Sequence, residues 1–443
     1  MMNPKPNHMI RRRKSDPQRL TCWLSLVLLG VLLFPGPGVH AQPASVLTID
    51  SCYARAQRNY PLIKQYDLIE KSKEYTISNA NKAYLPNISI TGIGAYIISG
   101  LPTISLPNAP TAEKKDFQFI GIGQLNQTIW DGGATHTQKE VAKAGAIADK
   151  ASIDVAMFEI RERINQLFFG ILVIDAQMEQ LDILVSNLTR SLNSAKLTSE
   201  NGLAYQSDVD EVKAELLNVK QRKIEFLYTR KGFVDMLSFM TGTALNETTK
   251  MDQPVVVENY LSLTNRRPEL DLYASQLRLT DVSGSFDKVA VMPKFGVMAA
   301  GILIEPGIAF GTATMNSLAV AGLSLSWNTS GLYRLSKNNK LNKIRQDKIT
   351  NQQETFLFNN ALQLKQGSNE IEKQQEIIKN DDEIVQLKIR IKNAYQLKYD
   401  NGICSMNDLI SSINKESEAK RNQALHRVQL LMSMYNYKAK TGN

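Results

Sequence analysis

One long stretch of the chain carries apolar residues in a strict heptad pattern. The apolar positions alternate between spacings of four and three residues; the series is Ile160, Ile164, Leu167, Ile171, Ile174, Met178, Leu181, Val185, Leu188 and Leu192. Such a seam predicts a long helix that packs along one face. With its flanks, this helix is expected from near Gln138 to Glu200, on the order of 90 Å at 1.5 Å per residue.

Each long helical stretch is expected to fold back on itself at an Asn-Gly motif. Asn201-Gly202 ends the first stretch, since glycine readily takes the left-handed conformation that closes helices. Gln206-Ser207-Asp208 then supplies capping oxygens for a returning helix toward Met240. A looser seam leads to Asn401-Gly402; its members are Ile377, Ile384, Leu387, Ile391 and Ala394. Both motifs are therefore predicted to be tips of antiparallel helical hairpins.

Four landmarks recur in the same order at an offset of about 200 residues. The pairs are Pro61 and Pro268, Pro86 and Pro293, Trp130 and Trp327, and Gly202 and Gly402. An ordered series at nearly one offset predicts an internal duplication. We expect repeat 1 at 42–242, a linker or equatorial segment at 243–264, where Pro254 breaks any helix, and repeat 2 at 265–443.

Between the helical stretches lie charge-poor segments that contain glycine and alternate in polarity. They predict strands at about 87–97 and 117–130 in repeat 1, and at about 294–304 and 317–327 in repeat 2. In the second segment apolar and polar side chains are expected on opposite faces; Phe117, Phe119, Leu125 and Ile129 form one set, and Gln118, Gln124, Asn126 and Thr128 largely form the other. Loops rich in Pro, Gly and Ser join each pair, at 99–112 and 305–315.

This alternation is typical of membrane β-strands. Trp130 and Trp327 close two strands at the level where an aromatic girdle would lie. Four strands cannot close a barrel, and an open sheet edge cannot face lipid. A membrane location therefore requires oligomerisation. The alternative is a pair of soluble hairpins that pack on the helices.

The first 41 residues are predicted to be a signal peptide that is cleaved after Ala41. A basic segment with Arg11 to Lys14 precedes the apolar run Leu20 to Phe34, which is shorter than the roughly 20 residues of a membrane-spanning helix. Removing Lys5, Arg11, Arg12, Arg13, Lys14 and Arg19 against Asp16 takes away a net charge of +5, so the formal +9 falls to +4. No dense basic block then remains to indicate nucleic-acid binding.

Catalytic chemistry has little support in the remaining chain. Only His136 and His426 are left, and neither a zinc-binding motif, a Cys/His cluster nor a phosphate-binding loop is present. An exported enzyme with a helical domain therefore lacks a recognisable constellation. We expect neither an enzyme nor a cofactor or metal site.

The ordered set of motifs resembles the TolC-type outer-membrane efflux proteins, over nearly all of the mature sequence. The resemblance is carried by both tips and by a series of short motifs; these are Leu47 to Asp50, Asn59, Pro61, Leu85-Pro86, and Leu125 with Gln127 and Ile129 to Gly133. It implies a homotrimer in which each chain contributes four strands to one twelve-stranded barrel in the outer membrane. The long helices would form a periplasmic α-barrel.

The resemblance also implies a function and partners. The chain would be the passive exit duct of a tripartite efflux or type I secretion system. A periplasmic adaptor (a membrane fusion protein) and an inner-membrane transporter would dock at the tips, and the transporter would supply the energy. A soluble periplasmic coiled-coil adaptor or scaffold is the alternative, but it leaves the alternating segments unexplained.

Specific tip residues acquire roles from the resemblance. Adaptor docking is expected at Asn201, Gly202, Leu203, Asn401, Gly402 and Ile403, and a periplasmic gate at Asp408, Asp208 and Glu211. A ring of three Asp408 carboxylates would repel anions. An Arg–Asp latch is not expected, because Cys404 stands where some members carry a basic residue and Ser411 where a second acid is frequent. The alternative role for Asp408 is a helix N-cap.

Two cysteines, Cys52 and Cys404, would remain after cleavage. Within the architecture that the resemblance implies, Cys404 lies at a tip and Cys52 lies in the first helix, nearer the membrane. The two thiols should then be tens of ångströms apart, beyond the roughly 7 Å Cα separation that a disulfide tolerates. Neither Cys22 nor Cys52 follows an apolar run with the small residues of a lipidation signal, so a lipid anchor is not expected.

Overall fold

A computed structural model describes residues 46–96, 117–256, 262–310 and 313–443. The described chain from Val46 to Asn443 forms one compact unit. The predicted signal peptide with its cleavage site, and the predicted loop at 99–112, lie outside the described residues.

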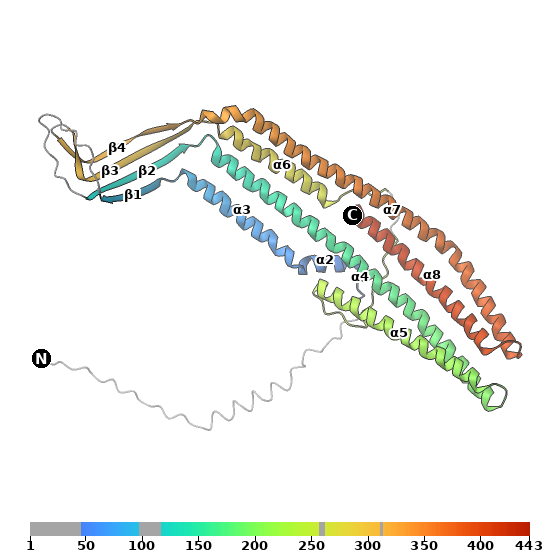
Figure 1. The fold of residues 1–443 in the computed structure, drawn as a ribbon. Helices are drawn as coiled ribbons and strands as arrows, with labels where there is room; N and C mark the ends of the chain where they lie inside the picture. The colour runs from blue at the N-terminus through green and yellow to red at the C-terminus, as the bar shows by residue number, and fades with distance from the viewer. Residues whose placement is uncertain (1–45, 97–116, 257–261, 311–312) are drawn as a thin grey trace, which may run out of the picture. The chain divides into compact units, whose positions relative to one another are not determined.

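The chain begins with two short helices and a strand pair, and continues into two long helices: α2 Ile49–Asn59, α3 Gln65–Asn81, β1 Asn87–Tyr96, β2 Phe117–Trp130, α4 Ala134–Glu200 and α5 Gln206–Thr241. The second half runs α6 Pro268–Val289, β3 Lys294–Phe310, β4 Ala313–Ser326, α7 Leu332–Asp400 and α8 Met406–Lys440. The order helix, strand pair, long helix and returning helix thus occurs twice (Figure 1). This repeated order supports the predicted duplication, whose boundaries stay a prediction.

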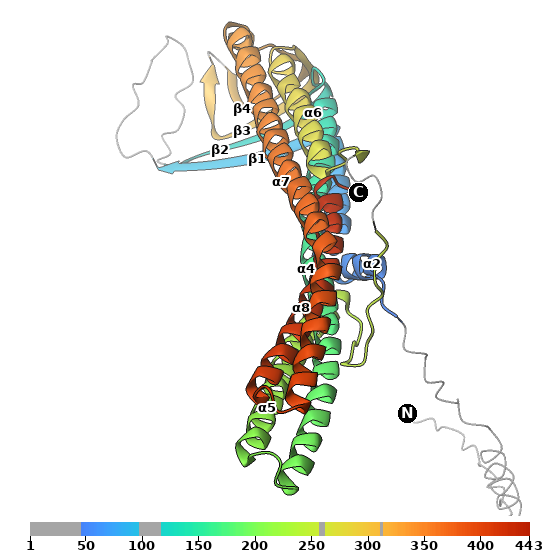
Figure 2. The same cartoon turned by 90° about the vertical axis from the view of Figure 1, so that its right-hand side faces the viewer.

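The predicted long helical hairpins are confirmed. Helices α4 and α7 have 67 and 69 residues, which is about 100 Å each at 1.5 Å per residue. All ten positions of the heptad seam on α4 are buried or half-buried, because α4 packs against α3 and α6 along one part of its length and against α5 and α8 along another. Figures 1 and 2 place the α4–α5 and α7–α8 turns at the same end of this helical unit.

The hydrophobic core consists of two main clusters along these helices. The upper cluster joins α2, α4, α5 and α8 around Phe168 and Phe169, which are fully buried. The lower cluster lies toward the tips and joins residues of the two hairpins, from Leu181 to Ala195 on α4, Val209 to Val219 on α5 and Met406 to Ile413 on α8. The tips of the two hairpins are therefore held together by apolar packing.

The four strands form one antiparallel sheet in the order β1-β2-β3-β4. Strands β3 and β4 continue past their expected ends. Beyond an irregularity between Leu303 and Ile308, pairing resumes and reaches Phe310 and Ala313, so most of the predicted loop at 305–315 is strand. Pairing between the backbones of adjacent strands overrides the turn preference of Pro306-Gly307.

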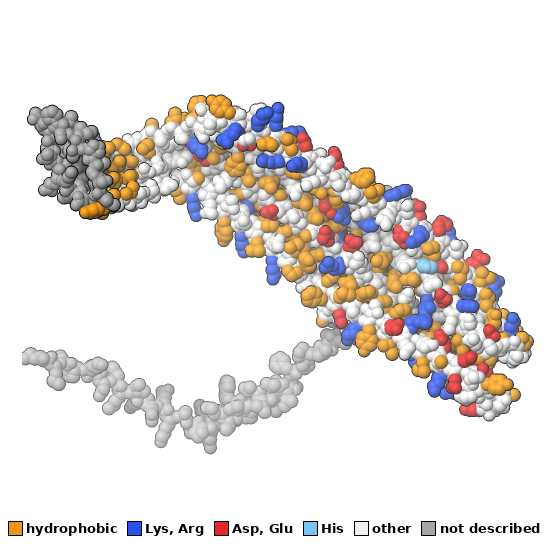
Figure 3. Space-filling model, in the orientation of Figure 1, with side chains coloured by type: hydrophobic (Ala, Val, Ile, Leu, Met, Phe, Trp, Pro, Cys, Tyr) orange, Lys and Arg blue, Asp and Glu red, His pale blue; other side chains and the backbone are white. Residues whose placement is uncertain are grey.

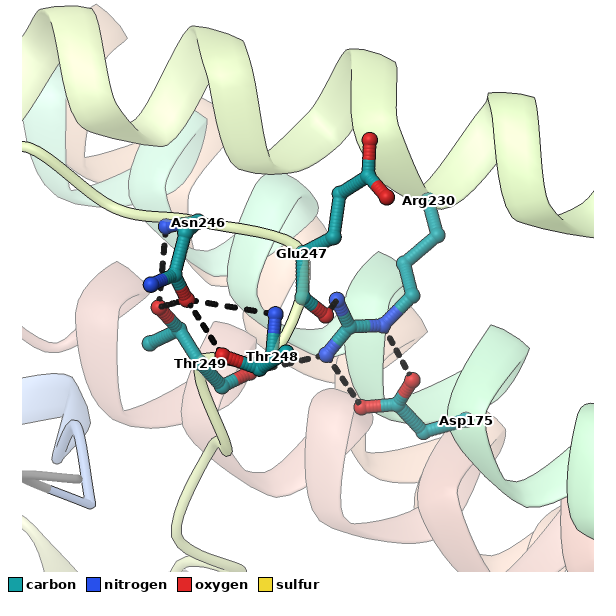
Figure 4. A network of polar contacts seen from close by, with 6 residues as sticks. All are labelled: Asp175, Arg230, Asn246, Glu247, Thr248 and Thr249. Carbon is teal, nitrogen blue, oxygen red and sulfur yellow. Dashed lines mark hydrogen bonds and ion pairs between the residues drawn. The ribbon is translucent and has the colours of Figure 1, made fainter.

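A buried arginine anchors the segment that follows α5. Arg230 donates from Nε and Nη2 to the two carboxylate oxygens of Asp175 on α4, at 2.5 and 3.2 Å. Its Nη1 and Nη2 also donate to the backbone carbonyls of Glu247 and Thr249, at 2.6 and 2.8 Å (Figure 4). Next to it, Leu47 pairs with Met251 in an isolated parallel bridge. One side chain thus connects two helices and the equatorial segment.

Candidate functional site

One face of the sheet is mostly apolar and has no neighbour in the described chain. Cross-strand pairing puts a large set of apolar side chains on this face; they include Ile88, Ile90, Tyr96, Phe117, Phe119, Leu125, Leu303, Leu323 and Leu325. Ile90 and Leu323 are 86% and 85% exposed. An exposed apolar surface of this extent is typical of a membrane or protein contact.

The opposite face of the sheet changes character along the strands. Near the helices it is polar, with Asn87, Ser89, Gln124, Asn126 and Ser324. Farther out it becomes apolar, with Ile93, Ile120, Ile122, Ile302, Ile304 and Leu318. The alternation predicted from the sequence is therefore clear only in the half nearest the helices. Hydrophobic side chains accordingly gather at the visible end of the sheet that is farthest from the helices (Figure 3).

The two tryptophans lie at the helix-proximal end of the sheet. Trp130 is the last residue of β2, and its ring lies 5.6 Å from that of Phe295 on β3. Trp327 follows the last residue of β4, and its indole Nε1 donates to the Val291 carbonyl at 3.0 Å. Both rings are more than one-third exposed. Indole rings with an exposed apolar body suit a membrane interface, so the girdle remains our prediction for these residues.

The strand-to-helix corner after Trp130 depends on Asp131, whose role sequence reasoning missed. The Asp131 carboxylate accepts hydrogen bonds from the backbone N–H groups of Gly133 and Thr135, at 2.9 and 2.6 Å, and from the Tyr84 hydroxyl at 3.0 Å. Burial opposes ionisation, but these hydrogen bonds outweigh it and lower the pKa of the carboxyl. Asn328 occupies the matching corner and accepts from the Ser330 N–H at 3.1 Å. The Trp-Asp and Trp-Asn pairs could have indicated these two caps.

The two predicted tips have the same backbone geometry. Gly202 and Gly402 both have φ of 72°, a left-handed conformation that glycine adopts without strain. The side chains of Asn201 and Asn401 donate to the carbonyls of the residues four positions earlier, at 2.8 and 2.7 Å. At the turns, Leu203 and Ile403 project apolar side chains that are 81% and 71% exposed. Each tip therefore presents an apolar residue on a well-defined turn.

Asp408 belongs to the cap of α8, but it is not the N-cap residue. Ser405 is the N-cap, and its Oγ accepts from the Asp408 N–H at 3.2 Å. In return, the Asp408 carboxylate accepts from the Ser405 hydroxyl and N–H, at 2.7 and 3.1 Å. These hydrogen bonds lower the pKa of the Asp408 carboxyl, so it is ionised at neutral pH. The expectation that Asp408 itself is the N-cap was therefore wrong by three residues. In a reciprocal capping box the acid stands at the third helical position, and the N-cap precedes it.

The first tip repeats part of this arrangement. The Asp208 carboxylate accepts from the Tyr205 N–H at 3.3 Å, and Glu211 lies exposed one turn farther along α5. The acids predicted for the gate thus lie at the starts of the two returning helices. Their role in gating stays a prediction.

The two cysteines are unpaired and differ in their surroundings. Cys52 is fully buried in the upper cluster, and burial raises the pKa of its thiol to about 12. Cys404 is half-buried at the second tip, where its Sγ lies 3.6 Å from the Tyr395 carbonyl oxygen. Because the thiolate is the reactive form, only Cys404 is suited to react in the folded protein.

We therefore expect a maleimide at pH 8 to modify Cys404 and to leave Cys52 unmodified until the protein is unfolded. With a pKa of about 12, about one Cys52 thiol in ten thousand would be ionised at that pH. Mass mapping of native and denatured samples checks this. Rapid modification of Cys52 in the native protein would show that the upper cluster opens readily.

The residues that the structure describes contain neither a metal-ligand cluster nor a membrane-spanning helix. No three or more His, Cys, Asp or Glu side chains there lie together as metal ligands would. None of the described helices combines the length and the hydropathy that are needed to cross a bilayer.

Comparison with known proteins identifies the fold of this chain. No family model matches the sequence, and no curated protein matches it. Among solved structures, the outer membrane protein VceC of Vibrio cholerae is 13% identical, with a TM-score of 0.62 over 89% of this chain and 94% of that one. The outer-membrane channel OprN is 12% identical, with a TM-score of 0.65 over 89% of each chain.

A third structure, the CmeC outer membrane channel of Campylobacter jejuni, is 14% identical, with a TM-score of 0.61 over 89% of this chain and 85% of that one. At these identities, the similarity lies in the arrangement of strands and helices described above. The chain has the fold of the TolC-type outer-membrane efflux channels.

Proposed function

We propose that this protein is the outer-membrane exit channel of a tripartite efflux or export system, and not an enzyme. The observation that carries the proposal is the four-stranded sheet, which exposes a broad apolar face and has β1 and β4 as its edge strands. An open edge leaves backbone N–H and C=O groups unpaired, and lipid offers them no partner. A membrane sheet of this kind therefore needs neighbouring copies to complete it.

A homotrimer meets this need. Pairing of β4 in one copy with β1 in the next would close a barrel of twelve strands and remove every edge. The apolar face would meet outer-membrane lipid, and Trp130 and Trp327 would lie at its periplasmic boundary. The signal peptide would direct export and be removed after Ala41.

The helices would continue the path into the periplasm. Helices of about 100 Å would form a tunnel that leads from the barrel to the tips. We assign the docking of a periplasmic adaptor to Asn201, Gly202, Leu203, Asn401, Gly402 and Ile403, since these turns expose apolar side chains at the end of the hairpins. An inner-membrane transporter would drive the substrate, and this chain would conduct it passively.

The native mass of the protein, extracted in detergent from purified outer membranes, tests this proposal. We expect a trimer of the mature chain that carbonate washing leaves in the membrane. A monomer or dimer in the soluble fraction would leave the sheet without a barrel. That result would replace the channel with a periplasmic coiled-coil scaffold.

We further propose that Asp408, with Asp208 and Glu211, lines the gate at the tunnel's end. Replacing Asp408 with Ala should raise the single-channel conductance and reduce cation preference, because three carboxylates would be lost from the narrowest point. Planar-bilayer recording with the purified protein measures both quantities.

Ser405→Ala is the matched control for this variant. It removes the hydroxyl of the capping box and keeps the Asp408 carboxylate. If gating depends on the charge, Ser405→Ala should keep the cation preference of the wild type. Equal changes in the two variants would assign Asp408 to capping alone.

A further inference from the structure

The packing between the two hairpins is interrupted by polar side chains at one level. The lower cluster extends away from the tips as far as Val219 of α5 and Ile413 of α8. The upper cluster resumes at Val234 and Val428 of the same helices. Around this level, α4, α5 and α8 line a partly open cavity of about 480 Å³. The levels above and below are apolar, so its polar lining requires a separate explanation.

Two arginines line this cavity from different hairpins, Arg222 on α5 and Arg421 on α8. Neither guanidinium forms a hydrogen bond or an ion pair with any residue that the structure describes. Each carries five N–H donors and a permanent charge. Both side chains are half-buried at the same cavity, and burial and the nearby charge of Arg222 lower the pKa of Arg421.

The carboxylates at the cavity, Glu215 and Glu418, form no ion pair with either arginine. The two oxygens of Glu215 accept from the side-chain amides of Asn414 and Asn218, at 2.9 and 3.4 Å. Glu418 is exposed, and it attracts Arg421 without forming an ion pair. The donors of both guanidinium groups therefore remain available to a bound anion.

Two buried polar atoms of the lining residues also lack partners. They are Oγ of Ser417, a residue that is 9% exposed, and Oδ1 of Asn414. A hydroxyl can donate to an anion, whereas the amide oxygen requires a donor. Hydrogen phosphate supplies accepting oxygens and a hydroxyl donor in one group. A phosphomonoester has such a hydroxyl on its phosphate only as the monoanion, since its second pKa is about 6. Sulfate supplies acceptors only.

We propose that this cavity binds a phosphate-bearing anion between Arg222 and Arg421. The planar guanidinium fork matches phosphate oxygens in pairs, and the anion would bridge α5 of one hairpin to α8 of the other. Binding would then hold the two hairpins together near the tips. Its effect on conduction rests on the proposed channel function, whereas the binding itself does not.

Isothermal titration of the full mature protein in detergent tests the proposal with inorganic phosphate, glycerol phosphate and sulfate as probes. We expect saturable binding of at least one phosphate probe, tighter than that of sulfate. Tighter binding of glycerol phosphate would indicate a phosphomonoester ligand, and tighter binding of inorganic phosphate would indicate the free ion. Arg222→Gln and Arg421→Gln should each weaken binding about tenfold or more, since each removes charge-assisted hydrogen bonds.

Lys415→Gln is the matched control, because it removes a positive charge from an exposed position on α8. It should change the affinity by less than about twofold, as expected for a screened charge outside the cavity. Thermal unfolding of each variant shows whether it folds. If the Arg421→Gln protein does not fold, Arg421→Lys, which retains the charge, takes its place. Three results would each overturn the proposal, even if the protein proves to be a trimer. They are a wild type that binds no phosphate probe, a wild type that binds sulfate with equal affinity, and equal weakening of binding in all variants, including Lys415→Gln.

Discussion

Replacing Arg230 with Met should lower the free energy of unfolding by about 2–4 kcal/mol, one of the two largest effects that we expect. The substitution leaves the Asp175 carboxylate and two backbone carbonyls without their shared donor. The Asp175 side chain is 35% exposed, so water would partly replace the lost partner, and the loss should be smaller than for a fully buried pair. The equatorial segment around Glu247 and Thr249 should then exchange its amide hydrogens faster.

Chemical unfolding, together with hydrogen exchange mapped over 243–252, checks this expectation. Lys231→Met is the neighbouring control, because Lys231 forms only an exposed ion pair with Glu247, at 3.2 Å. That pair should contribute no more than about 1 kcal/mol. Equal losses for the two variants would mean that the buried network does not hold the segment.

Replacing Gly296 with Ala should disrupt the pairing of β2 with β3. The position pairs with Thr128, next to the register shift that leaves Ile129 bulged. A Cβ at residue 296 would lie 2.6 Å from the Gln127 carbonyl oxygen and 3.0 Å from the Ser324 hydroxyl. The Gln127 oxygen belongs to the backbone, so it cannot move aside without separating the strands. We expect a cost of about 1–3 kcal/mol and a lower yield of assembled protein in the membrane.

Gly322→Ala provides the comparison within the same sheet. A Cβ at residue 322 would meet nothing within 4 Å, so this variant should assemble like the wild type. Heat-modifiable migration of the oligomer on gels, compared with the amount in the outer membrane, measures the difference. Normal assembly of the Gly296→Ala protein would show that the strand pair tolerates a wider spacing at the bulge.

The helical part of the fold follows from patterns that are local in the sequence. The spacing of Ile160 to Leu192 predicted α4, because only a helix brings positions three and four apart onto one face. Asn201-Gly202 and Asn401-Gly402 predicted the turns, because a left-handed residue ends a helix. The cap of α8 was predicted in the wrong place, since Asp408 was considered as the N-cap and the structure puts Ser405 there, with Asp408 as its reciprocal partner.

The sheet was predictable only in part. Residues 87–96 and 117–130 alternate clearly enough to indicate strands. The polarity of the face opposite the exposed apolar one could not be predicted over its whole length, because Ile120 and Ile122 alternate with glycine instead of with polar side chains. The extension of β3 past Pro306 depends on a partner strand, which the local sequence does not reveal.

By itself, the sequence determined the long helices, their tips and the presence of four strands in this protein, because each is encoded by a period or a turn within a few residues. The tertiary structure alone decided which distant groups meet. It places Arg222 and Arg421 at one cavity, although 198 positions separate them in the chain, and it joins Arg230 to Asp175 on another helix. Such contacts depend on how helices pack against one another, and periodicity within one helix carries no information about its partner's register.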